Sequence, residues 1–388
     1  MHSKIALIFY IIWLKVRQFF SFKRDIPRLL IVKIDAIGDY ILFRNYLNEI
    51  ATSSKYEGHK ITLVGNSILK DLIFELDGRI IENYISVDHH PSRKNWFSLL
   101  KELTKFKYQT VINFHYSRTI STEIITFAVS ASEKTTMNGD NLRIKPGTKK
   151  IFNLIYSSVI RIPSNLANEF EFNRIFTESI VGYKINYSYP SITLTDRKYS
   201  EHIHGSPYIV IAPGAGVESR RLNTSVLIEL TAFLLQKYTV CFVGSAMDAL
   251  IVNAIKENIP EQYLDKLIDM AGKTSLNILP HILDNSLCVV CTDSGPYHMS
   301  VALNKPVLCV AGGGHFKRFV QYKERENIAI CHKPMACYNC NWQCIFKFSP
   351  GSPYPCISPI GIDDILEKFK SIEQDWLNED HKEIDRVN

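Results

Sequence analysis

The 388-residue chain is long enough for two ordinary domains, and its composition, 46% apolar and 22% charged, is that of a globular protein with buried cores. This composition excludes a largely disordered chain and a long coiled coil. The formal net charge of +6 is too small for a typical nucleic-acid-binding protein, so an anionic small molecule or lipid is the expected partner.

Residues 1–26 form an apolar and basic N-terminal segment. Its apolar run, Ile5 to Leu14, is ten residues long, whereas a membrane-spanning helix needs about 20. No small-residue cleavage site of a secretory signal follows the run. We interpret the segment as an amphipathic helix on an anionic membrane surface, with a plain docking helix as the alternative. The expected location is cytoplasmic, peripheral on the inner face of the cytoplasmic membrane.

Residues 27–185 alternate between strand and helix patterns, which is typical of an α/β protein with parallel sheets. Strands are predicted at 28–34, 60–65, 80–87 and 108–114. Helices are predicted at 40–53, 95–106, 151–160 and 167–182. The pattern predicts an N-terminal Rossmann-like domain.

Residues 186–205 break the periodicity with prolines and mixed charges, as a linker does. The alternation restarts in residues 206–350, with strands predicted at 208–214, 238–245, 266–272, 287–293 and 306–312 and helices at 224–236 and 247–257. A C-terminal helix and tail are expected in 351–388. The whole chain therefore predicts two Rossmann-like domains that face each other across a cleft, with ligands at the carboxyl ends of the strands.

The loop after the first predicted strand reads "KIDAIGDY" and carries the first candidate site residues. Asp39 falls near the start of the following helix, where its charge is stabilised, and a simple N-cap role is the alternative. Lys33 and Arg44 flank the loop as cations suited to an anionic acceptor. Lys33 has the alternative of an exposed strand end.

Two loops of the second half join glycines to polar side chains. "APGAGVESRRLN" contains Gly214, which permits close approach of a ligand, and the cation Arg220; a solvated basic loop is the alternative. "GSAMD" places Gly244 and Ser245 at the start of a helix, where a cap is as reasonable as a ligand contact.

The stretch "CTDSGPYH" ends the strand at 287–293 and opens a helix. Free N–H groups at a helix start, next to a glycine, form an anion site that suits a diphosphate. Ser294 and Gly295 supply this start, and His298 adds a polar group. Asp293 orients the loop or accepts from a sugar hydroxyl. In the alternative interpretation Asp293 caps the helix and His298 is a core histidine.

The nine cysteines fall into two groups and one remainder, Cys331. Four lie in apolar strand patterns and are expected in the core: Cys241, Cys288, Cys291 and Cys309. Four others form a C-x2-C-x3-C-x11-C cluster: Cys337, Cys340, Cys344 and Cys356. This cluster could hold structural zinc or an iron–sulfur cluster, form disulfides, or remain as unligated thiols. A cytosolic location disfavours permanent disulfides.

Several segments, in the same order, resemble glycosyltransferase family 9, the heptosyltransferase family of lipopolysaccharide assembly. They are "LLIVKIDAIGDYIL", "IVIAPGAGVESRR", "FVGSAMD", "DMAGKTSL" and "VCTDSGPYHMSVALNKPVL". The resemblance implies a GT-B fold, with the acceptor on the N-terminal domain and the nucleotide-sugar on the C-terminal domain.

The resemblance also implies roles for single residues. The proposed base of the family falls on Asp39, and its phosphate-binding basic residue falls on Arg220. Its nucleotide-sugar loop falls on Asp293, Ser294, Gly295 and His298. Two departures, Leu222–Asn223 in place of Trp-Pro and "GGGHFKRF" in place of a Gly-Thr-Asp-Pro motif, leave the sugar and the nucleotide open.

The function expected from these observations is inverting transfer of a sugar, heptose or other, from a nucleotide-diphosphate sugar to a lipopolysaccharide or related cell-surface glycan. One carboxylate removes the acceptor proton, and a cation with a helix start neutralises the leaving diphosphate. Catalysis then needs no cofactor, and the chain has no Asp-x-Asp motif. The alternatives are a GT-B-like nucleotide-binding protein without transferase activity and another Rossmann-type nucleotide enzyme, although no strand is followed by G-x-G-x-x-G.

Overall fold

The computed structural model describes residues 27–88, 93–195 and 207–387. These residues divide into two compact units, with the boundary between Tyr187 and Ser188. The predicted N-terminal segment and part of the predicted linker lie outside the described residues. Among the helices of the described ranges, none is long and apolar enough to cross a lipid bilayer.

Unit 1, residues 27–187 of the described chain, is built on one sheet of six parallel strands in the order β3-β2-β1-β4-β5-β6. The strands are β1 (Arg28–Lys33), β2 (Lys60–Asn66), β3 (Asn83–Val87), β4 (Tyr108–Asn113), β5 (Ala131–Met137) and β6 (Ser158–Ile160). β1 and β4 lie side by side at the centre, so their carboxyl ends meet at one edge. Polar residues that follow these two strands are therefore neighbours in space.

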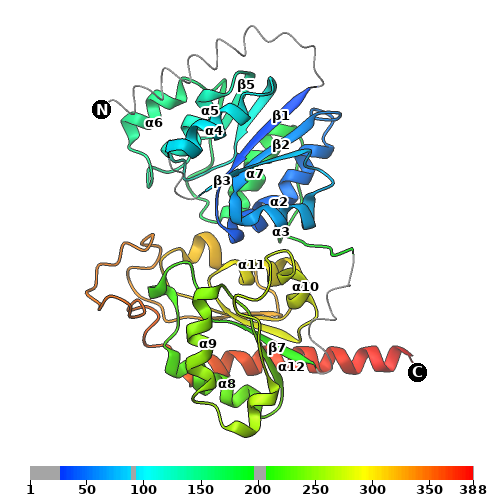
Figure 1. Ribbon diagram of the computed structural model, residues 1–388, viewed down its shortest axis with the longest axis vertical. Coiled ribbons are helices and arrows are strands. Elements are labelled where there is room, and N and C mark those ends of the chain that lie inside the picture. Colours follow the sequence, from blue (N-terminus) through cyan, green and yellow to red (C-terminus); the bar gives the residue numbers. More distant parts are fainter. Residues whose placement is uncertain (1–26, 89–92, 196–206, 388) are drawn as a thin grey trace. The chain divides into compact units, whose positions relative to one another are not determined.

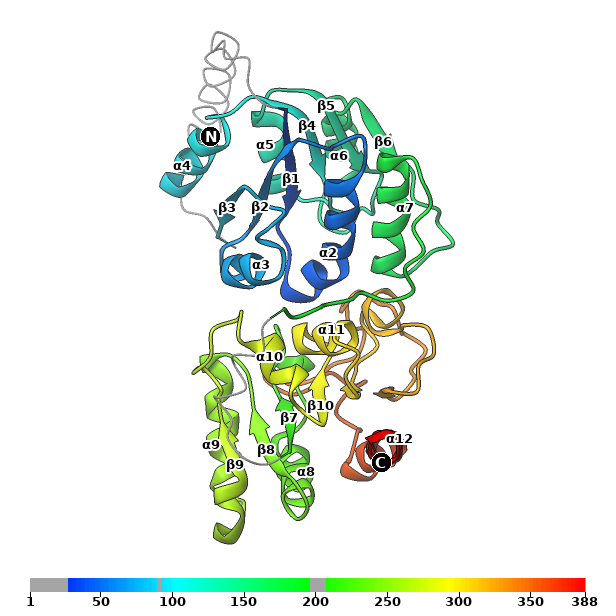
Figure 2. The same ribbon diagram turned by 90° about the vertical axis from the view of Figure 1, so that its right-hand side faces the viewer.

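Helices cover both faces of this sheet (Figures 1 and 2). They are α2 (Ile37–Thr52), α3 (Lys70–Asp77), α4 (Arg93–Leu103), α5 (Ile120–Ala128), α6 (Pro146–Asn153) and α7 (Glu169–Val181). α4 and α5 bury leucines, isoleucines and alanines against one face, where the strands contribute residues such as Val32 and Val111. α2 and α7 pack together on the other face, where the ring of Phe114 contacts those of Phe43 and Phe176.

Unit 2 repeats the architecture with six parallel strands in the order β12-β11-β10-β7-β8-β9. The strands are β7 (Tyr208–Ala212), β8 (Thr239–Phe242), β9 (Leu267–Asp269), β10 (Cys288–Thr292), β11 (Val307–Val310) and β12 (Ile328–Cys331). The helices are α8 (Thr224–Leu235), α9 (Ala249–Lys256), α10 (Leu279–Asp284), α11 (Gly295–Ala302) and α12 (Ile362–Val387). α8, α9 and α12 cover one face, and α10 and α11 lie on the other (Figures 1 and 2).

The predicted α/β fold class is confirmed, because both sheets are parallel and carry helices on both faces. One element was predicted wrongly. The helix expected at 151–160 ends at Asn153, and Ser158–Ile160 instead forms edge strand β6 beside β5. The β-branched residues Val159 and Ile160 at the end of this stretch pair with β5. The helical periodicity of the stretch gives no sign of this pairing. The four cysteines predicted for the core are buried there.

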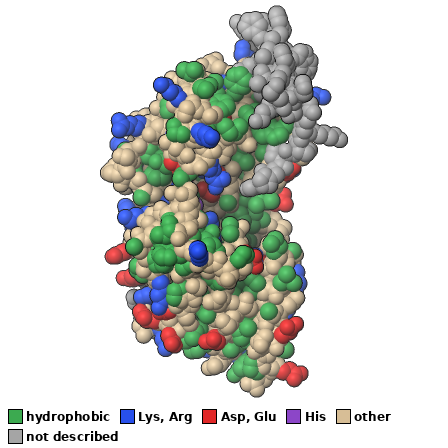
Figure 3. Space-filling view, turned by 90° about the vertical axis from the view of Figure 1, so that its left-hand side faces the viewer, with side chains coloured by type: hydrophobic (Ala, Val, Ile, Leu, Met, Phe, Trp, Pro, Cys, Tyr) green, Lys and Arg blue, Asp and Glu red, His purple; other side chains and the backbone are tan. Residues whose placement is uncertain are grey.

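Figure 3 shows how the charged side chains are distributed on one face of the molecule. On the face drawn in Figure 3, Lys and Arg lie scattered among acidic and apolar side chains. A nucleic-acid-binding surface gathers its cations in a stripe or patch. This face therefore resembles the surface of an ordinary globular enzyme.

Candidate functional sites at the carboxyl ends of the strands

The end of β1 in unit 1 holds a buried ion pair. Lys33 is 3% exposed, and its Nζ lies 2.8 Å from Oδ2 of Asp35. Burial alone would lower the pKa of Lys33, but the carboxylates of Asp35, Glu169 and Asp39 raise it above its usual range. Burial would raise the pKa of Asp35, yet the Lys33 ammonium lowers it well below its usual range. Both groups are therefore charged near neutral pH, and Lys33 is not an exposed strand end.

His115 completes this cluster from the loop after β4. Its Nε2 accepts the N–H of Ile34 at 2.9 Å, and its Nδ1 lies 2.8 Å from Oδ1 of Asn113. These contacts fit a neutral ring that carries its proton on Nδ1. Burial, helped by the charge of Lys33, lowers the pKa of His115 to about 4, which agrees with a neutral ring. His115 therefore supports the loop without adding a charge.

Asp39 lies in the first turn of α2, half-buried, two residues after Ile37. The N-cap of this helix is Ala36, whose side chain cannot cap, so the interpretation of Asp39 as the N-cap is wrong. The carboxylate nevertheless sits where the helix dipole favours negative charge. It is also near enough to raise the pKa of Lys33. The structure thus brings Lys33, Asp35 and Asp39 to one loop.

Arg44, the other predicted acceptor contact, is held inside unit 1. Its Nε and Nη2 donate to the two carboxylate oxygens of Asp77 at 3.0 and 2.9 Å, and the Tyr40 hydroxyl donates to the same carboxylate. The side chains of Arg44 and Asp77 are 11% and 2% exposed. This bidentate pair fastens α2 to the end of α3. The contacts of Arg44 with Asp77 favour a structural role over contact with an acceptor.

In unit 2, Gly214, Gly244 and Ser245 surround one carboxylate, that of Asp248. Oδ2 of Asp248 accepts from the backbone N–H and the hydroxyl of Ser245, both at 2.8 Å. A Cβ on Gly214 would fall 2.6 Å from Asp248 Oδ1, and one on Gly244 would fall 2.8 Å from Oδ2. Arg221 approaches Oδ1 at 3.2 Å. The side chain of Asp248 thus explains why positions 214 and 244 are glycines. For Ser245, the geometry favours a capping role over a ligand contact.

The stretch after β10 forms the helix start that the sequence predicts. Ser294 is the N-cap of α11, but its hydroxyl donates to the carbonyl of Thr292 at 3.2 Å and makes no capping bond. Gly295 and Pro296 open the helix. Because the cap side chain does not cover the first turn, the positive end of the helix suits an anion.

Asp293 precedes this helix start and is 10% exposed at its side chain. Burial raises its pKa to about 6, although the nearby Arg220 guanidinium acts in the opposite direction. A carboxylate with this pKa lies in a site that disfavours negative charge and is only partly compensated by its cation.

His298 backs this carboxylate from inside α11. Its ring is 3% exposed, and burial lowers its pKa to about 3, so it is neutral near pH 7. Nδ1 lies 2.8 Å from the Tyr322 hydroxyl, and Nε2 lies 4.0 Å from Oδ1 of Asp293. His298 thus matches the core histidine of the alternative interpretation.

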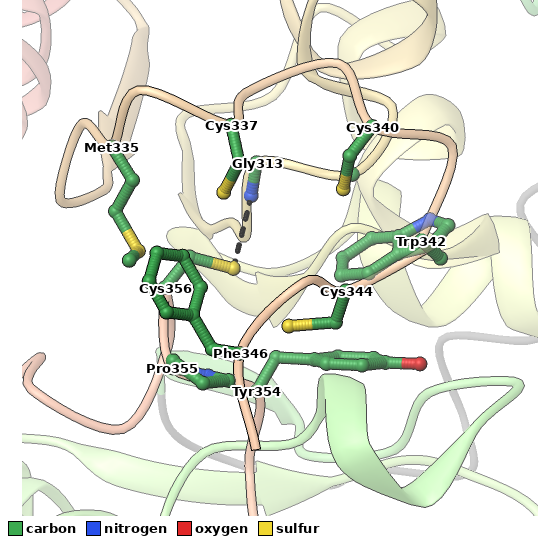
Figure 4. A pocket seen from close by; sticks show the side chains of 11 residues that line it. Gly313, Met335, Cys337, Cys340, Trp342, Cys344, Phe346, Tyr354, Pro355 and Cys356 are labelled. Carbon is green, nitrogen blue, oxygen red and sulfur yellow. Dashed lines mark hydrogen bonds between the residues drawn. The ribbon is translucent and has the colours of Figure 1, made fainter. Parts of the chain in front are cut away.

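The clustered cysteines line a single pocket after β12, drawn in Figure 4. Its walls also include Gly313, Trp342 and Tyr354, and the N–H of Gly313 donates to Sγ of Cys356 at 3.3 Å. The free space, about 10 Å³, holds roughly one water molecule and no nucleobase. Burial raises the pKa of Cys356. Over the described ranges, no three His, Cys, Asp or Glu side chains form a group that could hold a metal ion, so the metal site stays a prediction.

Three supporting residues escaped the sequence analysis. Asp248 had a signal, the spacing Ser-x-x-Asp of a capping box within "GSAMD". His115 also had one, since it follows a strand that pairs with β1. Trp342 had none, because its contact with Arg220 joins loops 122 residues apart.

Comparison with known proteins identifies relatives of this arrangement. The family model described as glycosyltransferase family 9 (heptosyltransferase) matches residues 96–347. Lipooligosaccharide heptosyltransferase 2 of Haemophilus influenzae is 32% identical over 108 residues, 27% of this chain and 31% of that protein. The Haemophilus ducreyi protein of the same name is 30% identical over 125 residues, 31% of this chain and 36% of that protein. The matches thus span about a third of these relatives.

Solved structures share the fold over most of the chain. ADP-heptose lps heptosyltransferase II of E. coli has a TM-score of 0.69 at 15% identity and covers 91% of this chain and 99% of its own. E. coli heptosyltransferase WaaC with ADP has a TM-score of 0.61 at 18% identity, covering 79% and 93%. The iron-containing dodecameric glycosyltransferase TibC of E. coli has a TM-score of 0.53 at 12% identity, covering 90% and 77%.

Proposed function

The chain belongs to glycosyltransferase family 9, and from this premise we propose that it is an inverting glycosyltransferase that uses a nucleoside-diphosphate sugar. The acceptor is a lipopolysaccharide-type glycan. The observation that carries the proposal is the start of α11: an N-cap that leaves the first turn open, beside a buried carboxylate and Arg220. Such a site is suited to a diphosphate.

Asp39 is the base in this proposal. Of the two carboxylates in the loop after β1, Asp35 is paired with Lys33 and its pKa is lowered, so it is a weak base. Asp39 takes the proton of the acceptor hydroxyl as that oxygen attacks the anomeric carbon. The bond between this carbon and the diphosphate oxygen breaks, and its electron pair leaves with the diphosphate.

The leaving diphosphate is the ligand of unit 2 in this proposal. Its developing negative charge is met by Arg220 and by the helix start at Ser294 and Gly295. Because burial raises the pKa of Asp293 to about 6, a bound diphosphate has to raise it only a little further for the carboxyl to be protonated beside the phosphates. In this proposal the carboxyl accepts from a sugar hydroxyl. The Asp248 cluster holds the loops after β7 and β8 in shape. No metal is needed for these steps, so a chelator should leave transfer unchanged.

The finer assignments follow from the same premise. Unit 1 carries the acceptor and unit 2 the donor, as in the family. Lys33 is paired with Asp35, so in this proposal it shapes the loop that meets the acceptor rather than contacting the acceptor itself. Residues 1–24 are proposed to hold the enzyme on the inner face of the cytoplasmic membrane. Deleting them should abolish sedimentation with anionic vesicles without loss of transfer. Binding of the truncated chain to vesicles would move the membrane contact elsewhere.

A transfer assay with a panel of nucleotide-sugars, beginning with ADP-heptose, tests the proposed activity. Asp39→Asn should lower kcat by roughly 10²- to 10⁴-fold, because the acceptor loses its general base. ADP binding should stay near the wild-type value, since Asp39 belongs to unit 1. Asp35→Asn is the matched control for loss of a carboxylate in the same loop, and its effect should be smaller. A fully active Asp39→Asn variant would remove this residue from the mechanism.

The rival function is a nucleotide-binding protein of the same fold without transferase activity. Wild-type protein that binds ADP but transfers no sugar from any donor of the panel would favour it. Failure to bind any nucleoside diphosphate would reject both functions.

A further inference from the structure

Trp342 lies between two of the clustered cysteines and contacts the proposed phosphate-binding cation. The Arg220 guanidinium carbon stands 4.2 Å from the centroid of its ring. A cation over the face of an indole is attracted to it, and a guanidinium in this position tends to stack with its plane on the ring. The N–H groups of Arg220 lie in that plane, so the indole determines which way they point.

The indole is held firmly by its surroundings. Its Nε1–H donates to Nδ1 of His315 at 3.2 Å, and its ring lies 5.1 Å from that of Tyr354 between centroids. A Cβ on Gly314 would fall 2.2 Å from the ring, so this glycine is required for the indole to fit. Figure 4 shows Trp342 and Tyr354 on the wall of the cysteine pocket.

The backbone at Trp342 has a strained, left-handed conformation, which the packing of its side chain can maintain. Its φ is +62°, a left-handed conformation that bulky side chains rarely adopt. The preceding residue, Asn341, is also left-handed, and its N–H donates to the carbonyl of Gly314 at 2.8 Å. Strain of this kind persists where surrounding contacts enforce it, and it concentrates at functional sites.

A second contact joins the loop of Trp342 to the loop that carries Arg220. The N–H of Tyr354 donates to the carbonyl of Ser219, the residue before Arg220, at 2.8 Å. The loop that carries the clustered cysteines, residues 335–356, therefore contacts the segment η3 (Glu218–Arg220) twice. Tyr354 contacts its backbone and Trp342 contacts its guanidinium. The loop's own pocket is too small for a nucleotide, so its contribution to a ligand passes through η3.

We propose that Trp342 is a positioning residue for donor binding: it orients Arg220 toward the diphosphate of the nucleotide-sugar. This inference rests on the proposed function, because Arg220 is its target. Trp342 itself does not touch the donor. Its effect should therefore require both the phosphates of the ligand and the side chain of Arg220.

Calorimetry with ADP and adenosine on the full chain tests the proposal. Trp342→Leu should weaken ADP binding about two- to fivefold, which corresponds to the loss of one partly exposed cation–π contact. Adenosine binding should be unchanged. Trp342→Phe should restore ADP binding, because it keeps an aromatic face. In an Arg220→Ala background, Trp342→Leu should have no further effect.

Phe348→Leu is the matched control, an aromatic of the same loop that packs on Tyr354. It should bind ADP as the wild type does. If Trp342→Leu does not fold, Trp342→Met gives the same comparison with a more flexible side chain that adapts to the space left by the indole. Equal losses for ADP and adenosine, or an undiminished effect without Arg220, would overturn the proposal. Wild-type protein that does not bind ADP would instead reject the proposed donor site.

Discussion

The two units treat buried charge differently. In unit 1, the buried cations Lys33 and Arg44 each meet a carboxylate of the same unit at hydrogen-bond distance. In unit 2, the charge of Arg220 acts on the buried Asp293, but burial has the larger effect and raises the pKa of this carboxyl to about 6. Unit 1 has balanced its charges before any ligand arrives. In unit 2 a destabilised carboxylate beside a helix start indicates a site that a ligand completes.

The largest effect should come from breaking a balanced pair. Asp77→Ala removes the carboxylate that accepts from Arg44 and Tyr40 and leaves a buried guanidinium uncompensated. The free energy of unfolding should fall by about 3–5 kcal/mol. Chemical denaturation measures this. A loss under 1 kcal/mol would mean that the pair is no more valuable than a surface ion pair.

The opposite sign is expected at Asp293. Its folded-state pKa is raised to about 6 from an ordinary value near 3.8, so the stability it provides is lost as pH rises through this window. Asp293→Asn should therefore raise the free energy of unfolding at pH 8 by about 2–3 kcal/mol and give no gain at pH 4. Chemical denaturation of both proteins at pH 8 and pH 4 tests this prediction. An equal change in the free energy of unfolding at both pH values would contradict it.

A smaller loss is expected at the Asp248 cluster. Asp248→Ala removes the acceptor of the Ser245 N–H and hydroxyl, and capping interactions of this kind contribute about 1–2 kcal/mol. The same change should weaken ADP binding only modestly, because the proposed phosphate contacts come from Arg220 and α11. Thermal unfolding with and without ADP separates the two effects. A loss of ADP binding without a loss of stability would make Asp248 a ligand contact.

Periodicity and motif order predicted much of the fold and the helix start at Ser294. Continuous apolar runs such as 28–34 and 287–293 are typical of strands that are buried on both faces of a parallel sheet, so the sequence alone predicts a strand at each. The helix start at Ser294 followed from Gly-Pro after a strand. Strands β6 and β12 escaped because edge strands are short and are fixed by their neighbours rather than by their own pattern. The interior strand β5 also escaped, because its sequence, ASEKTTM, has no apolar run.

The sequence did not predict which side chains the candidate site residues contact. Arg44 and Asp77 lie on different helices, and the spacing of 33 residues between them carries no signal of their contact. The same holds for Arg220 and Trp342. Sequence patterns identify which residues are polar at strand ends, whereas packing decides which of these are already satisfied within the protein.

The carboxylate of Asp248 also constrains how the proposed donor site can be altered. It fills the space beside Gly214 and Gly244 and so joins the loops after β7 and β8 into one block. An alanine at either glycine would collide with it unless residue 248 became smaller as well. A larger residue at Gly214 or Gly244 must therefore be accompanied by a change at residue 248.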